Sequence, residues 1–162
     1  MRTFKDTELK IFEHILYLTQ EQLKQFMATF LKRHYPNVVE TRDYIVAEGA
    51  IPIALAAHLD TVFQFPPENI LYDRVKNVMI GLGGAGFDDR AGVFAIIKLV
   101  QAGLKPHIIL TTEEEAGGLG AKALSSKKCP FSDLRYIIQL DRRGSNDCVF
   151  YDCDNKEFIP YI

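Results

Sequence analysis

The sequence predicts an α/β fold with a largely parallel central sheet. Three short and almost wholly apolar runs, "IPIALAAHLD", "PHIILTT" and "LRYIIQLD", are typical of strands that are covered on both faces. Helical patterns precede and separate these runs, and strands that alternate with helices favour parallel pairing. The chain has 162 residues, 48 % of them hydrophobic, which is enough for one globular domain with a buried core. We therefore expect a single domain over 1–162, with helices in 1–36 and the sheet in 44–162.

The first part of the chain, 7–33, predicts two helices. Thr19 and Gln22 have the spacing of a capping box, in which each side chain accepts a hydrogen bond from the other residue's backbone N–H, so the second helix begins there. Pro36 cannot continue a helix and marks its end. The apolar residues of this helix recur at the spacing of one buried face and are assigned to the core: Leu23, Phe26, Met27, Phe30 and Leu31.

The remaining elements follow in chain order. "DYIVAE" predicts a strand that ends at a turn around Gly49, and "IPIALAAHLD" follows it as the next strand. After a loop with Pro66 and Pro67, a helix is predicted over "RAGVFAIIKLVQAG", with Gly103 near its end. A short helix is expected around "LGAKALSS", between the last two apolar strands, and "CVFYD" is a candidate for a further strand.

Polar side chains gather where the predicted strands end. His58 and Asp60 end one strand, the glutamates 113–115 follow a second, and Asp141 ends a third, while the aspartate pair 88–89 precedes a helix. Ligands of open α/β sheets bind at the carboxyl ends of the strands, so we expect these groups to converge on one rim. Carboxylates crowded around one imidazole repel one another unless a cation lies among them. This donor set contains no cysteine and suits zinc, manganese or cobalt.

Spacing gives Asp60 a specific relation to His58. Residues two apart in a strand point to the same face, so the Asp60 carboxylate can accept a hydrogen bond from one ring nitrogen of His58. Such a bond leaves the other ring nitrogen free for a metal, fixes the tautomer and raises the basicity of the ligand.

The glycine-rich segment "GLGGAG" permits a second interpretation. Gly81, Gly83 and Gly86 fit the pattern G-x-G-x-x-G, which can cradle a pyrophosphate at a helix N-terminus. However, the aspartates 88–89 follow the last glycine and place negative charge where a phosphate would lie. The acidic residue expected after the next strand is replaced by the triplet 113–115. We therefore favour a tight turn beside the rim over a dinucleotide site.

Four segments, taken in order, resemble the co-catalytic dizinc exopeptidases: "AAHLDTV", "GFDDRAG", "TTEEEAGGLGA" and "IIQLD". This clan contains bacterial aminopeptidases, tripeptidases, carboxypeptidases and N-acyl-amino-acid deacylases. The resemblance covers roughly residues 45–145. It implies a three-layer α/β sandwich of the phosphorylase/hydrolase-like type with a largely parallel, mixed sheet, which we expect to be incomplete at the C-terminus.

The spacing between the motif residues indicates which type of exopeptidase within this clan the chain resembles. Some relatives insert a dimerisation domain between the histidine and the bridging aspartate, but only about thirty residues separate His58 from Asp88. Others insert a lid domain after the position of Asp141, where too little chain remains for one. The resemblance therefore favours the single-domain aminopeptidase type.

By position, the resemblance implies a role for each acidic group. It makes His58 and Asp141 ligands of one metal and Asp88 the carboxylate that bridges two metals. Glu115 corresponds to the ligand of the second metal and Glu114 to the general base. The implied cofactors are two divalent ions, zinc first, with cobalt or manganese as alternatives. Such a pair shares a water, lowers its pKa and polarises the scissile carbonyl.

Further implications concern the neighbours of these residues. Asp60 matches the carboxylate that supports the metal-binding histidine. The peptide after the bridging aspartate is often cis in such relatives, so we expect a cis bond between Asp88 and Asp89. Glu113 is assigned a supporting or solvated role.

One expected ligand is missing from the sequence. The relatives supply a last histidine, late in the chain, to the second metal, whereas no histidine follows Asp141 here. His14 and His34 are read as surface or packing residues, and His107 begins the strand whose other end carries the glutamates. We expect a stronger site with three protein ligands and a weaker one with two. Either the sequence is a fragment, or the second site is incomplete, or a partner chain completes it, so a homo-oligomer stays open.

The expected function is that of a zinc-dependent exopeptidase of aminopeptidase type, acting on peptides. A deacylase of N-acyl amino acids is the alternative with the same chemistry, and a non-catalytic metal-binding or interaction module is the alternative of another class. A net charge of −2 without a basic patch argues against nucleic-acid binding. The sequence shows no signal peptide and no membrane-spanning run, and its three cysteines suggest reduced thiols, so a cytoplasmic location without membrane contact is expected.

Overall fold

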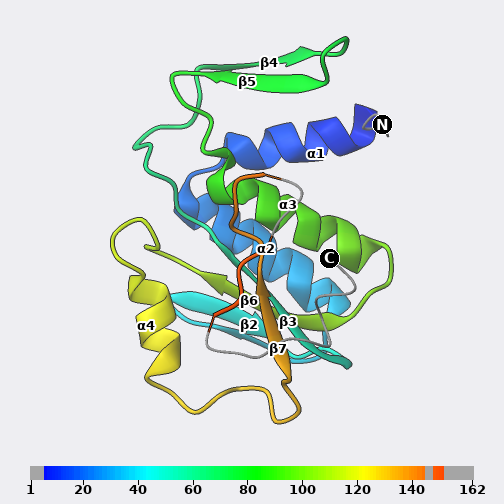
Figure 1. Cartoon of the computed structure of the whole chain (residues 1–162), viewed down its shortest axis with the longest axis vertical. Coiled ribbons are helices and arrows are strands. Elements are labelled where there is room, and N and C mark those ends of the chain that lie inside the picture. Colours follow the sequence, from blue (N-terminus) through cyan, green and yellow to red (C-terminus); the bar gives the residue numbers. More distant parts are fainter. Residues whose placement is uncertain (1–5, 145–147, 152–162) are drawn as a thin grey trace.

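The computed structural model describes residues 6–144 and 148–151, which form an α/β fold around a five-stranded sheet (Figure 1). The helices are α1 (Asp6–Leu16), α2 (Gln20–His34), α3 (Phe87–Gln101) and α4 (Leu119–Ser125). The strands are β1 (Val38–Glu40), β2 (Tyr44–Ala47), β3 (Ile51–His58), β4 (Asn69–Asp73), β5 (Val78–Leu82), β6 (Pro106–Thr111) and β7 (Tyr136–Gln139).

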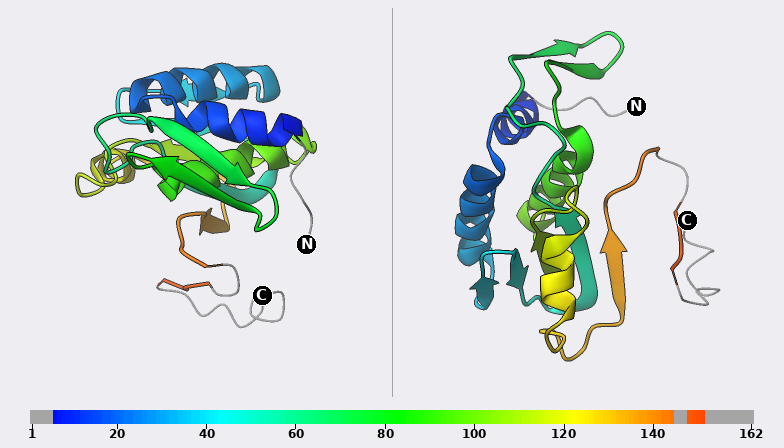
Figure 2. Two further views of the ribbon diagram at one scale, coloured as in Figure 1. Left: turned by 90° about the horizontal axis from the view of Figure 1, so that it is seen from above. Right: turned by 90° about the vertical axis from the view of Figure 1, so that its left-hand side faces the viewer.

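The central sheet has the strand order β1-β2-β6-β3-β7 and is mixed. β3 pairs in parallel with β6 and with β7, whereas β2 pairs antiparallel with β1 and β6. β7 lies at the edge of the sheet away from β1 (Figure 2). Because β6, β3 and β7 run in one direction, their carboxyl ends share one rim, as the sequence predicted for the polar clusters.

Side chains that alternate along the strands fill two cores and make the fold a three-layer sandwich. Leu55 and Ala57 of β3 pack into the larger core, which α1, α2 and α3 cover. Ala54 points the other way into a smaller core with Leu124 of α4 and Phe131. Figure 1 shows α4 on the side of the sheet away from α3. The predicted fold class is therefore confirmed.

The local signals at α2 hold in the structure. Thr19 Oγ1 accepts a hydrogen bond from the Gln22 N–H at 3.3 Å, and Gln22 Oε1 accepts one from the Thr19 N–H at 2.9 Å, so the capping box is confirmed. Leu23, Met27 and Leu31 are fully buried, as the apolar stripe predicted. Among the described helices, none has the length and apolar character needed to cross a bilayer.

The start of α3 is irregular, and this irregularity exposes Asp88. Gly86 adopts a left-handed conformation with φ 55°, and neither Asp88 nor Asp89 has helical backbone angles. The bond between these two aspartates is cis, as the resemblance predicted. Regular helix geometry begins at Arg90, where the sequence placed the start of this helix.

The structure corrects one expected strand and adds others. In the segment "CVFYD", residues Cys148–Tyr151 are not in a strand, so that prediction is wrong for them, and Asp152 lies outside the described residues. Val149, Phe150 and Tyr151 are exposed, and an apolar run forms a strand only where a neighbour pairs with it. The sequence reading also omitted β1 and the antiparallel β4–β5 hairpin, which stands apart from the sheet (Figure 1).

Candidate metal centre

Four separate segments bring the predicted site residues to one rim. His58 is the last residue of β3, Asp88 lies at the start of α3, and Asp141 follows β7. Their ligand atoms lie within 4.8 Å of one another. His58 also forms a group of the same size with Glu114 and Glu115, which follow β6.

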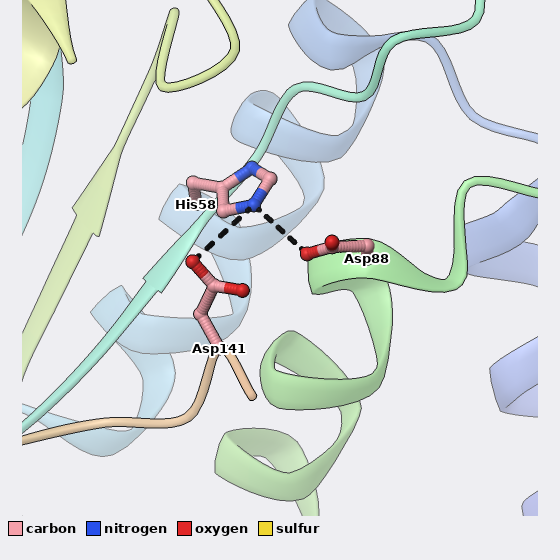
Figure 3. Close-up of side chains that lie close together, drawn as sticks. All are labelled: His58, Asp88 and Asp141. Atoms are coloured by element: carbon pink, nitrogen blue, oxygen red, sulfur yellow. Dashed lines mark hydrogen bonds and ion pairs between the residues drawn. The ribbon is translucent and has the colours of Figure 1, made fainter. Parts of the chain in front are cut away.

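The two ring nitrogens of His58 face different carboxylates, of which Figure 3 shows Asp88 and Asp141, the two that face Nε2. Nε2 lies 3.2 Å from Asp88 Oδ1 and 3.9 Å from Asp141 Oδ2. Nδ1 lies 3.3 Å from Asp60 Oδ1, on the other side of the ring. The His58 side chain is buried, whereas that of Asp88 is largely exposed. The ring is therefore held from behind by Asp60 and presents Nε2 to an accessible pair of carboxylates.

Crowding of negative charge shifts the pKa values of this rim. Burial lowers the pKa of His58, but Asp60, Asp89 and Asp141 outweigh it and raise that pKa to about 9. Burial and the neighbouring Asp88 raise the pKa of Asp141. Burial also raises the pKa of Glu115, with a further contribution from nearby carboxylates. Carboxylates with raised pKa values around one imidazole form an electrostatic environment that a bound cation would stabilise.

Asp60 connects the end of β3 to the glutamate triplet. Its Oδ2 accepts a hydrogen bond from the backbone N–H of Glu115 at 2.9 Å, while Oδ1 faces His58. Burial would raise the pKa of Asp60, but His58 and the N–H groups of Glu114 and Glu115 lower it. Asp60 is therefore ionised and orients two of the candidate ligands together.

Asp89 has a structural role that the sequence reading did not assign. Its carboxylate accepts hydrogen bonds from the backbone N–H of His58 at 3.3 Å and of Gly92 at 3.0 Å. Burial raises its pKa to about 7, with a contribution from Asp141. A side chain added to Gly92 would collide with this carboxylate at 2.3 Å. Asp89 thus caps the first turn of α3 and fixes it to the end of β3, and the glycine three residues later is the signal that sequence reading missed.

The glutamate triplet sits on a turn that its neighbours hold tightly. The carbonyl oxygen of Glu114 accepts hydrogen bonds from the N–H groups of Gly117 at 2.9 Å and Gly118 at 2.8 Å. A side chain on Gly120 would lie 2.5 Å from the carbonyl oxygen of Thr112. Close approach of the backbone therefore explains Gly120, whereas Gly117 and Gly118 have positive φ angles of 96° and 70°.

Glu113 is tied to the start of α2. Gln20 Nε2 donates to Glu113 Oε1 at 2.6 Å, and Gln20 Oε1 accepts from the Glu113 N–H at 3.1 Å. Glu113 has φ 54°, a left-handed conformation that is unfavourable for a residue with a side chain. The reciprocal amide contact offsets this cost and links the N-terminal helices to the turn that carries Glu114 and Glu115.

The glycine-rich segment packs closely against the loop that follows β3. A side chain on Gly84 would meet the Phe63 ring at 2.2 Å, and one on Gly86 would meet Thr61 Oγ1 at 2.7 Å. The loop after β3 therefore lies against these glycines, and its close approach accounts for them. The structure agrees with a tight turn beside the rim.

Arg90 joins α3 to the α1–α2 junction. Its side chain is buried, and its Nη1 donates to the carbonyl oxygens of Ile15 and Leu18, the latter at 2.8 Å. Burial lowers the pKa of Arg90 to about 10, while Asp60 acts in the opposite direction. The residue next to the aspartate pair thus fixes the N-terminal helices against the rim.

The other buried histidine lies at the opposite end of the sheet. His107 Nδ1 accepts a hydrogen bond from the Gly49 N–H at 3.0 Å, and its Nε2 lies 3.0 Å from Asp133 Oδ1. Its ring stacks on Phe131 with centroids 4.2 Å apart. His107 is therefore a packing residue, and it lies at the end of its strand away from the glutamates, as predicted.

The rim fits divalent cations. Its donors are one imidazole nitrogen and carboxylate oxygens, a set suited to zinc, manganese or cobalt. Asp88 and Asp141 both face His58 Nε2, an arrangement that a shared cation would stabilise. Within residues 6–144 and 148–151, His58 is the histidine of both ligand groups.

Comparison with solved structures identifies proteins that share this fold. The aminopeptidase PepT from Bacillus cereus superposes with a TM-score of 0.68 at 17 % identity, over 85 % of this chain. A tripeptidase from Staphylococcus aureus gives 0.67 at 18 % identity, also over 85 %. The dipeptidase Dug1p from Saccharomyces cerevisiae gives 0.58 at 15 % identity, over 83 %. No family model and no curated protein sequence matches the chain.

The likeness concerns part of each neighbour. The chain spans 43 % of the length of the PepT and tripeptidase structures and 38 % of the Dug1p structure. At sequence identities of 15–18 %, these superpositions show that the chain and the matched part of each neighbour share a fold.

Proposed function

We propose that this chain is a metal-dependent hydrolase that cleaves a peptide bond at a chain terminus, with aminopeptidase-like specificity. The observation that carries the proposal is the convergence of one buried imidazole and several carboxylates at the carboxyl ends of β3, β6 and β7. Support comes from the fold, which solved structures of an aminopeptidase, a tripeptidase and a dipeptidase share.

The chain offers ligands for two cations, with zinc as the first expectation. His58, Asp88 and Asp141 would hold one ion. Glu115 would hold the second together with Asp88. When bound, such cations polarise a carbonyl oxygen and lower the pKa of water.

The remaining steps belong to side chains of this protein. Asp60 holds the His58 ring so that Nε2 faces Asp88. Glu114, fixed by the turn at Gly117, takes a proton from the attacking water and gives it to the leaving amine as the C–N bond breaks.

Charge around the rim favours a free amino terminus over a free carboxylate. The cavity beside the cluster is lined by Asp60, Glu113 and Glu115 and by one cation, Arg90. The guanidinium of Arg90 is already bonded to carbonyl oxygens of the α1–α2 junction. An ammonium group is therefore attracted and the carboxylate of an N-acyl amino acid repelled, which favours an aminopeptidase over a deacylase.

The test is hydrolysis by the zinc-loaded protein of aminoacyl-anilides and of N-acetyl amino acids. We expect turnover of the anilides that a chelator abolishes and added zinc restores. Glu114→Gln should retain zinc and lose turnover by about 100-fold or more, since a general base contributes that much. Glu48→Gln, which changes an acid bonded to Asn37 instead, is the matched control.

Each other result has a definite meaning. Turnover of the N-acetyl panel alone would replace the aminopeptidase with a deacylase. Zinc binding without chelator-sensitive turnover on either panel would contradict the hydrolase and support a metal-binding module. An active Glu114→Gln variant would remove the general base from the proposal.

A further inference from the structure

A cavity of about 640 Å³ opens beside the candidate metal centre. It lies between the α1–α2 junction, the loop that follows β3 and the glycine turn before α3. Asp60 and Glu115 belong both to its lining and to the cluster around His58. Its size falls in the range of small-molecule sites, so a substrate fixed at the rim can place a neighbouring group in it.

The walls of this cavity carry polar and apolar side chains in similar measure, and the apolar ones come from the loop and from the helices. Phe63, Phe65 and the prolines 66–67 line the side formed by the loop, and Leu16 and Leu18 line the side formed by the helices. The exposed fractions of Phe63 and Phe65 are 42 % and 78 %. Burying such rings is favourable at roughly 25 cal/mol per Å² of apolar surface, so an apolar guest gains free energy here.

The wall formed by Phe63 is fixed before any guest arrives. Its ring lies against the backbone of Gly84, where any side chain would approach it to 2.2 Å. Thr61 Oγ1 accepts a hydrogen bond from the Phe63 N–H at 3.2 Å and itself lies against Gly86. A wall that is already in place costs little ordering entropy on binding.

The opposite wall is fixed through Arg90. Its bonds to the carbonyl oxygens of Ile15 and Leu18 hold the junction of α1 and α2 beside the rim. The polar rim of the cavity carries the acids Asp60 and Glu115, next to the candidate ligands. The cavity therefore combines apolar side chains from the loop and the helices with acidic groups that it shares with the cluster around His58.

The geometry points to this cavity as the subsite for a large apolar side chain of a substrate that has a free amino group. This inference rests on the proposed function, because it places the reacting bond at the cluster. In this inference, selectivity for the first side chain of the substrate comes from Phe63 and Phe65 on the loop and from Leu18 on the helical side. The substrates it predicts are peptides that begin with a bulky aliphatic or aromatic residue.

The kinetic test compares leucyl-, phenylalanyl-, alanyl- and glutamyl-anilides with the zinc-loaded protein. We expect kcat/KM for the leucyl and phenylalanyl substrates to exceed that for the alanyl substrate by about tenfold or more, from burial of the added carbons. Phe65→Ala should reduce this ratio several-fold. Val75→Ala, a change at a fully exposed position in the β4–β5 turn, is the matched control and should leave the ratio unchanged.

A binding measurement separates this inference from the proposed function. Titration calorimetry on the zinc-loaded Glu114→Gln variant with L-phenylalaninamide, L-alaninamide and N-acetyl-L-phenylalanine reports occupancy with hydrolysis of the amides suppressed. We expect the first to bind about tenfold more tightly than the other two, and Phe65→Ala and Phe63→Leu each to reduce that preference.

The outcomes are distinct. Turnover with equal rates for leucyl and alanyl substrates, or a ratio unchanged in Phe65→Ala, would overturn the subsite and leave the hydrolase in place. Absent turnover with preferential, Phe65-dependent binding of phenylalaninamide would support the subsite and contradict the hydrolase. Equal binding of all three probes, or stronger binding of N-acetyl-phenylalanine, would also overturn the subsite.

Discussion

His58 and His107 are two buried histidines at opposite ends of the same sheet, and their surroundings differ in kind. His107 has a backbone N–H on one ring nitrogen and Asp133 on the other, so its polar atoms are matched one to one. His58 meets carboxylates at both nitrogens. Matched partners indicate packing, whereas an excess of one charge at the carboxyl ends of parallel strands indicates a place for a ligand.

The largest effect should come from removing each histidine in turn. His58→Ala is expected to lower zinc affinity by more than about 100-fold, because a direct ligand matters more than the groups that orient it. His107→Ala should leave zinc binding in place and lower the free energy of unfolding by about 2–4 kcal/mol, from the cavity and the unsatisfied Gly49 N–H. Calorimetric zinc titration and urea unfolding measure the two. Loss of zinc binding in the His107 variant, with zinc binding retained in the His58 variant, would show that the ligand is His107 and not His58.

The partner carboxylates sharpen the contrast. Asp60→Asn should weaken zinc binding by about 10- to 100-fold, since Asp60 orients the His58 ring and holds the Glu115 backbone. Asp133→Asn, the same change beside His107, should leave zinc affinity within about twofold, because no candidate ligand contacts it. Equal effects of both variants would show that the carboxylate beside His58 has no special role.

Proton release provides a third distinction. The pKa of His58 is raised to about 9 in the metal-free chain, so this ring is protonated at pH 7 and zinc must displace the proton. Calorimetry in buffers of different ionisation enthalpy should report one proton or more released from the wild type, because Asp89, with a pKa of about 7, is also partly protonated at pH 7. The number should be unchanged in His107→Ala. Zinc binding without proton release would contradict the raised pKa.

The same pKa sets the pH dependence of stability. A pKa raised above the unfolded value of 6.5 stabilises the metal-free protein fully below pH 6.5, and this contribution is lost as pH rises through about 9. The stability difference between the wild type and His58→Gln should therefore shrink across that interval. Urea unfolding of the chelated proteins at several pH values measures it, and a constant difference would contradict the shift.

The smallest effect concerns the contact that holds the triplet from α2. Gln20→Ala should lower kcat by a factor of a few and the free energy of unfolding by about 1 kcal/mol, because Glu113 loses two hydrogen bonds in an unfavourable conformation. Gln25→Ala, which removes a contact to Glu21 on the exposed face of the same helix, should leave kcat unchanged. Equal effects of both variants would exclude a positioning role for Gln20.

Local sequence signals accounted for much of the fold. The Thr19–Gln22 capping box and the apolar runs that became β3, β6 and β7 depend on short-range patterns, which a sequence displays directly. The hairpin of β4 and β5 was not anticipated, because its face with Leu71, Ile80 and Leu82 is exposed and no buried stripe marks it. The strand expected at 148–151 failed because propensity does not supply a pairing partner.

The candidate site also has features that the sequence predicted and features that only the structure shows. The sequence indicated which residues meet at the rim, because strand ends on one edge of a sheet converge whatever the intervening chain does. It could not indicate the contact between Gln20 and Glu113 or that between Arg90 and Leu18, which join residues far apart in the chain. Only the packed structure places the α1–α2 junction against the cavity.

The parallel pairing of β7 with β3 has a consequence for the order of folding. Asp141 reaches His58 only after β7, the last strand among the described residues, has docked along β3. Contacts between distant segments form late because loop closure must precede them. A partly folded chain therefore lacks the complete group of His58, Asp88 and Asp141, and we expect tight zinc capture to follow the docking of β7 rather than to precede it.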